Sequence, residues 1–117
     1  MSEPVVVNLE AFRPYNGGQG VRLAVTSTTA SALIPGLAGG EPNDRRRVLI
    51  VNSSLYSSAF VRLGQSGVRA DTGSLEVMAR SSMTLTPQYT GPGAVYIAAI
   101  CNAGESTNLN ICAGQGT

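Results

Sequence analysis

The sequence contains no histidine, no lysine and no tryptophan, and all eight of its basic residues are arginine. Histidine is the side chain best placed to move protons near neutral pH, and lysine supplies Schiff bases and the base of Ser-Lys hydrolases. A glycosidase needs two carboxylates across a cleft. Sugar binding by stacking depends on aromatic rings, and the sequence lacks tryptophan and is only 5% aromatic. We therefore expect a protein that binds or assembles, that is not an enzyme, and that uses no cofactor.

Charge is also scarce. Charged residues make up 13% of the 117 residues, about half of the usual quarter, and the net charge is +1. A chain with so small a net charge has no long-range field that attracts nucleic acid or an anionic membrane. Its first residues lack the basic and apolar regions of a signal peptide, and no apolar run approaches the roughly 18 residues that span a bilayer. We expect one domain, made in the cytoplasm, with no nucleic-acid or membrane partner.

The two cysteines, Cys101 and Cys112, end two apolar segments, 94–101 and 107–112, that suit a hairpin. Pairing of these segments would place the two cysteine Cα atoms about 20 Å apart, whereas a disulfide requires less than about 7 Å. Two cysteines without histidine cannot complete a zinc tetrahedron. The sequence predicts two free thiols and no metal site.

Period-two alternation of apolar residues, as in segment 20–26, predicts strands throughout. Segment 47–52 is apolar on both faces and rich in β-branched residues, which is typical of a central strand, and we expect it to form a hairpin with 58–64. Segment 27–33 is expected to be an extended edge, with a helix as the alternative. Further strands are predicted at 67–70, 74–79, 81–86, 95–101 and 107–113.

Gly, Pro, Asn, Asp and Ser interrupt these segments at the intervals of a β-sandwich. The predicted fold class is therefore all-β: a single-domain antiparallel β-sandwich, jelly-roll-like, with an extended N-terminal segment. Residues 1–19 form an N-terminal arm or a first strand, and residues 20–117 form the sandwich domain. Segment 5–9 suits a strand, which pairs either within its own sheet or with the sheet edge of another subunit.

Arginine in place of lysine favours interfaces, because the guanidinium group forms bidentate pairs with carboxylates and tolerates burial. Arg62 and Arg69 either keep a strand face soluble or contact a partner, and the sequence leaves both open. The run 45–47 follows two acidic residues and suits a solvated or interface cluster better than a phosphate site. Tyr96 lies on the face of its segment opposite Ile97, so one face can contact a second sheet and the other a second subunit.

Several segments together resemble small virion proteins of tailed bacteriophages: 21–33, 47–53 with 59–64, 94–100 and the closing 114–117. Within that group the chain is most similar to capsid decoration or cement proteins. The resemblance implies a compact β-sandwich on the outer surface of the virion capsid, where it ties subunits of the major capsid protein together. It also implies a homodimer or homotrimer, and it carries no catalytic residues.

Our hypothesis is that the protein stabilises a phage head by binding across capsomer boundaries. The alternatives are an accessory domain of a tail or receptor-binding fibre and, more remotely, a small hydrolase using Asp71 or Glu76. The candidate interface consists of residues in the N-terminal segment, the loop 35–46 and two strands: Val5, Val7, Leu9, Phe12, Arg13, Tyr15, Leu37, Arg45, Arg46, Arg62 and Tyr96.

Overall fold

The computed structural model describes residues 12–14, 20–35, 46–87 and 95–116, and all regular structure within them is β-strand. The nine strands are β1 (Phe12–Pro14), β2 (Val21–Val25), β3 (Ala30–Leu33), β4 (Arg46–Asn52), β5 (Ala59–Gly64), β6 (Leu75–Val77), β7 (Ser81–Leu85), β8 (Tyr96–Ile100) and β9 (Thr107–Gly116).

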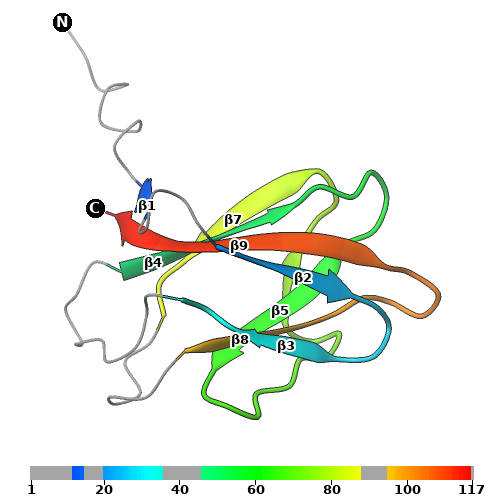
Figure 1. Cartoon of the computed structure of the whole chain (residues 1–117). Helices are drawn as coiled ribbons and strands as arrows, with labels where there is room; N and C mark the ends of the chain where they lie inside the picture. The colour runs from blue at the N-terminus through cyan, green and yellow to red at the C-terminus, as the bar shows by residue number, and fades with distance from the viewer. Residues whose placement is uncertain (1–11, 15–19, 36–45, 88–94, 117) are drawn as a thin grey trace, which may run out of the picture.

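The strands form two antiparallel sheets that pack face to face (Figure 1). Sheet A has the order β1-β9-β4-β7, with β2 also paired to β9, and sheet B has the order β3-β8-β5-β6. The pairs β5–β6, β4–β7, β3–β8 and β2–β9 are nested like the two arms of one long hairpin, which is the topology of a jelly roll. The predicted fold class, an all-β antiparallel sandwich of jelly-roll type, is confirmed.

The core lies between the sheets and is built from alternate residues of each strand. In β4, Val48 and Ile50 are fully buried, and Ile50 lies opposite Ile111 of β9 on one side and Met83 of β7 on the other. Sheet B supplies Val61 and Ile97 to the same core. Such burial of aliphatic side chains is the main favourable term in folding, at about 25 cal/mol per Å² of apolar surface.

The predicted hairpin between 47–52 and 58–64 is wrong, because β4 belongs to sheet A and β5 to sheet B. The hairpin expected between 95–101 and 107–113 is wrong for the same reason: β8 lies in sheet B and β9 in sheet A. Both cysteines are nevertheless free, as predicted. In a jelly roll most strands that are neighbours in sequence cross to the opposite sheet, so the shortest connection does not identify the pairing partner.

Segment 67–70 is not a strand but part of the loop between β5 and β6. This loop turns back along sheet B (Figure 1), where the side chain of Val68 sits against Gly64 so closely that a Cβ on the glycine would lie 2.9 Å from Val68 Cγ2. The N–H of Ala70 donates to Thr29 Oγ1 at 3.1 Å, just before β3. Within segment 27–33, Ala30–Leu33 form β3, an edge strand of sheet B as predicted, whereas residues 27 and 28 form a bend before it.

The N-terminal segment is described only at β1, which pairs with Gly114–Gly116 of β9 in the domain's own sheet. The rest of segment 1–19 lies outside the described residues, so the choice between an arm and a first strand stays a prediction for it. Most of the long loop 35–44 also lies outside them.

One buried polar side chain joins the two sheets. Asn52, at the end of β4, is 1% exposed. Its Nδ2 group donates to the carbonyl oxygens of Ser57 at 2.9 Å and Val77 at 3.0 Å, and its Oδ1 accepts from Thr107 Oγ1 at 2.7 Å and from the N–H of Ser54 at 3.1 Å. The amide thereby fixes the connection from β4 to β5 against the end of β6.

Candidate functional site

Three large apolar side chains are exposed together at one end of the sandwich: Leu55 and Tyr56 in the β4–β5 connection, and Met78 just after β6. Tyr56 is 87% exposed, and the other two are about 60% exposed, at 59% and 60%. The amide of Asn52 binds both Ser57 and Val77, so it holds the two segments side by side, as Figure 1 shows for the β4–β5 and β6–β7 connections. We call Leu55, Tyr56 and Met78 the end patch.

The backbone beneath the end patch is fixed by hydrogen bonds. Ser54 Oγ accepts from the N–H groups of Tyr56 at 3.3 Å and Ser57 at 3.0 Å. On the other side, Ser81 Oγ donates to the carbonyl of Met78 at 2.6 Å, and between them Arg80 has a left-handed backbone with φ of 61°. These hydrogen bonds order the backbone that carries the exposed side chains, so little conformational entropy is lost when they contact a partner.

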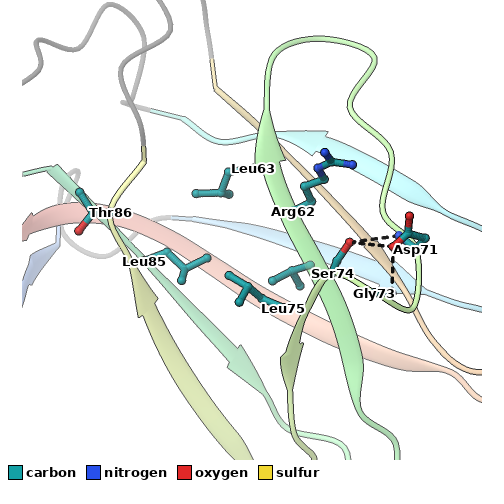
Figure 2. Close-up of a pocket in the computed structure, with 9 residues that line it drawn as sticks. Arg62, Leu63, Asp71, Gly73, Ser74, Leu75, Leu85 and Thr86 are labelled. Atoms are coloured by element: carbon teal, nitrogen blue, oxygen red, sulfur yellow. Dashed lines mark hydrogen bonds between the residues drawn. The ribbon is translucent and has the colours of Figure 1, made fainter.

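A second candidate site is a cleft of about 620 Å³ at the open edge between the two sheets (Figure 2). Strand β6 pairs only with Ala59–Val61 of β5, and the cleft lies beside the next two residues of β5, Arg62 and Leu63. We call it the edge cleft. Its lining comes from β5, from the turn before β6, from β6 itself and from the end of β7: Val61, Arg62, Leu63, Asp71, Gly73, Ser74, Leu75, Leu85 and Thr86.

The edge cleft has an apolar side and a polar side. Leu63, Leu75 and Leu85 lie on the inner side of the strands, whereas Arg62 extends from the opposite face of β5 (Figure 2). Leu63 and Leu85 pack partly against the core, and Leu75 is 53% exposed. Alternation along β5 therefore presents a leucine and an arginine to the two sides of the same sheet edge.

The polar rim is shaped by the turn 71–74. Asp71 Oδ1 accepts from the N–H of Gly73 at 2.9 Å and from the hydroxyl of Ser74 at 3.5 Å, and the N–H of Ser74 donates to the carbonyl of Asp71 at 2.9 Å. This carboxylate thus stabilises its own turn. Across the described part of the chain, the guanidinium of Arg62 forms no ion pair.

A smaller hollow of about 400 Å³ lies on the outer face of sheet A, beside Leu49, Val51 and Cys112. Burial raises the pKa of the Cys112 thiol. The pKa of the Cys101 thiol is raised first by burial and then by the nearby Glu105 carboxylate. Both thiols are therefore protonated, and poor nucleophiles, near neutral pH.

Among the predicted interface residues, the structure brings Arg62 and Tyr96 together. Both point to the outer face of sheet B, where Arg62 lies opposite Ala98 and Tyr96 lies opposite Gly64, so the two are diagonal neighbours on β5 and β8. Arg46 belongs to the other sheet: it begins β4 in sheet A and lies opposite Gln115 of β9.

The other predicted interface residues are described only in part or not at all. Phe12 and Arg13 belong to β1, and their side chains are not described. The remaining six lie outside the described residues: Val5, Val7, Leu9, Tyr15, Leu37 and Arg45. Sequence reasoning missed the end patch altogether, because a single apolar residue in a loop has no periodic signal; Leu55-Tyr56 between serines was the only hint of it.

Metal-ligand clusters and membrane-spanning helices are both absent from the described residues. These residues contain no group of three or more Cys, Asp, Glu or His side chains placed to hold a metal ion. They also contain no helix whose length and apolar character would let it cross a bilayer.

Comparison with known proteins yields the fold. No family model matches the sequence, and no curated protein sequence matches it. Among solved structures, the chain is similar to the low-affinity xylan-binding module CBM86 of Roseburia intestinalis, with a TM-score of 0.51 and 11% identity over 91% of this chain and 81% of that chain. It is also similar to PirA, with a TM-score of 0.50 and 14% identity over 80% and 91%.

The coat protein of Tobacco streak virus overlaps at a lower TM-score of 0.41, with 11% identity over 90% of each chain. The TM-scores of the first two structures indicate a shared fold, and identities of 11% and 14% do not carry function from one protein to another.

Proposed function

We propose that this protein is a virion structural protein, not an enzyme, that binds the outer surface of a phage head and stabilises the capsid lattice by bridging subunits of the major capsid protein. In this proposal it acts as a homodimer or homotrimer on the assembled head. The resemblance of its strand segments to decoration proteins points to the head, and the end patch is the structural observation that supports a role in protein binding.

The end patch supports binding because of its composition and because hydrogen bonds hold its backbone. Exposed apolar side chains that stand singly are ordinary, but clustered ones mark contact sites. Tyrosine and arginine are over-represented among the residues that dominate binding energy, and the two adjoining connections expose Tyr56 and Arg80. The small number of charges on the chain lowers the cost of desolvating the surrounding surface.

The proposed mechanism is mass action. A protein that binds the assembled lattice and not its dissociated subunits adds its binding free energy to the stability of the lattice. Contact through a small apolar surface at many equivalent positions makes this stabilisation large even when each contact is weak, because bound copies that span two subunits must be released before the subunits separate.

The test is to mix purified protein with heads that lack it and to measure co-sedimentation and resistance to heat. We expect wild-type protein to co-sediment and to raise the temperature at which heads release DNA. Tyr56→Ala should weaken binding by about tenfold or more, as for a central binding residue. Leu33→Ser is the matched control, because Leu33 is an exposed apolar side chain, at 46%, at the other end of sheet B. It pairs with Tyr96, which lies opposite the last residue of β5, whereas Leu55 and Tyr56 come just before the first residue of β5.

Failure of wild-type protein to bind heads, with label on tails in immunogold images instead, would replace the proposal with the fibre alternative. Equal loss of binding in the Tyr56 and Leu33 variants would contradict the assignment of the contact to the end patch.

A further inference from the structure

We infer that the edge cleft is a second contact and that it binds an extended segment of the partner protein in which an apolar side chain stands directly beside an acidic one. This inference rests on the proposed function for the identity of the partner, the major capsid protein. The chemistry of the segment follows from the residues of the cleft.

The shape of the site favours an extended chain. The cleft lies along the edge of β5, next to the residues that β6 does not reach. A segment laid along this edge would continue the line of β6, and peptides commonly bind proteins by adding to a sheet edge in this way. A helix, with a diameter of about 10 Å, matches a narrow strand edge less well.

Alternation then dictates the side chains. Successive residues of an extended segment point to opposite faces, as Leu63 and Arg62 do on β5 (Figure 2). A residue opposite Leu63 therefore faces Leu75 and Leu85, where an apolar side chain removes leucine surface from water. The residue next to it faces the outer side, where Arg62 lies.

Charge selects the second residue. Arg62 forms no ion pair within the described residues, and a guanidinium group pairs with a carboxylate through two parallel hydrogen bonds. Two acids lie on the same side: Asp71, which stabilises its own turn through Oδ1, and Glu76, a diagonal neighbour of Arg62 across the β5–β6 pair. These acids disfavour a segment with several carboxylates, so the fit is a single acidic residue beside the apolar one.

The test is a titration of the ¹⁵N-labelled full chain with four hexapeptides, acetylated and amidated, that share the frame Ser-Thr-X-Z-Thr-Ser. X-Z is Leu-Asp in the first probe, Leu-Asn in the second, Leu-Lys in the third and Ser-Asp in the fourth. With the Leu-Asp probe we expect amide shifts confined to the residues that line the edge cleft. The Leu-Asn and Ser-Asp probes should bind about three- to tenfold more weakly, as expected when an exposed ion pair or an apolar contact is lost.

Arg62→Gln should lower the affinity for the Leu-Asp probe by the same factor and should abolish the difference between the Asp and Asn probes. The matched control is Arg69→Gln, because Arg69 is exposed in the adjoining loop and does not line the cleft. Absence of binding, shifts that map elsewhere, tighter binding of the Leu-Lys probe, or equal effects of the two arginine variants would each overturn the inference.

These outcomes are separate from those of the proposed function. If wild-type protein binds heads through Tyr56 while the titration fails, the edge cleft is not a contact but the head proposal stands. If the titration succeeds while heads are not bound, the cleft recognises this chemistry and the partner is a protein other than the capsid.

Discussion

The amide of Asn52 is the most informative single target for mutation, because it is the buried polar group that joins both sheets to the connection beneath the end patch. Asn52→Ala removes four hydrogen bonds at distances between 2.7 and 3.1 Å. The buried Thr107 hydroxyl would lose its 2.7 Å bond and keep only a 3.5 Å contact with the carbonyl of Asn108, and the Val77 carbonyl would lose a donor.

The size of the effect follows from these groups. A hydrogen bond contributes about 1 kcal/mol net, and a buried group left without a partner costs about 1–3 kcal/mol. Ser54 and Ser57 are only half-buried, so water can replace the amide there. We expect Asn52→Ala to lower the free energy of unfolding by about 3–5 kcal/mol, a large share of the roughly 5–15 kcal/mol of a typical domain.

Urea unfolding at 25 °C, followed by far-ultraviolet circular dichroism, measures this difference. Thr107→Val breaks only one of the four bonds and should cost about 1–2 kcal/mol, and the double variant should lose less than the sum because the two side chains share a bond. Asn110→Ala, an exposed asparagine of β9, is the matched control and should stay within about 0.5 kcal/mol of wild type. A loss below about 1 kcal/mol for Asn52→Ala would refute the reasoning.

Three further predictions concern other features of the fold. Gly20→Ala should lower the free energy of unfolding by about 1–3 kcal/mol in the same urea assay, because a Cβ at Gly20 would collide with the carbonyl oxygen of Ile111. An unchanged midpoint of urea unfolding would contradict this and would mean that β9 moves aside freely. Arg80→Gly should raise the free energy of unfolding by about 1 kcal/mol, because glycine adopts the left-handed backbone without the cost borne by other residues; destabilisation would show that the arginine side chain contributes more than the strain costs. The protein should become less stable at alkaline pH, because burial raises the pKa of the Cys101 and Cys112 thiols in the folded state. Above the ordinary thiol pKa of about 8.5 the unfolded chain therefore holds fewer protons than the folded chain, and the free energy of unfolding falls as pH rises. A double Cys→Ser variant should show a smaller fall, and equal slopes for both proteins would contradict this assignment.

The strands could be predicted from the sequence because their physical signal is local. The period-two pattern of Val21, Leu23 and Val25 and the apolar run that became β4 each follow from the residues themselves. The intervals between turn residues then gave the β-sandwich class.

The pairing of strands could not be predicted in the same way. Both β4 and β8 are apolar on both faces, so their pattern does not say which sheet they join, and a hairpin was the simplest choice for each. One contact that links β4 to the opposite sheet is made by Asn52, whose amide reaches Val77, 25 residues away in sequence. Such a long-range contact leaves no trace in a window of a few residues.

The candidate sites show the same division. Arg62 was selected because of its charge among small neighbours, and it lies at the edge cleft. The leucines around it come from three separate segments that only the folded chain assembles. The connections that carry Tyr56 and Met78 are likewise held together by the Asn52 amide. Sequence reasoning thus named two charged residues of the edge cleft, Arg62 for an interface and Asp71 for the hydrolase alternative, and neither of the surfaces.

Electron cryo-microscopy of heads mixed with the purified protein tests the central claim most directly. The account predicts added density for a jelly roll on the outer shell at the boundaries between capsomers, with the connection that carries Leu55 and Tyr56 against the major capsid protein. Bare shells at saturating protein, or density confined to the tail, would contradict it.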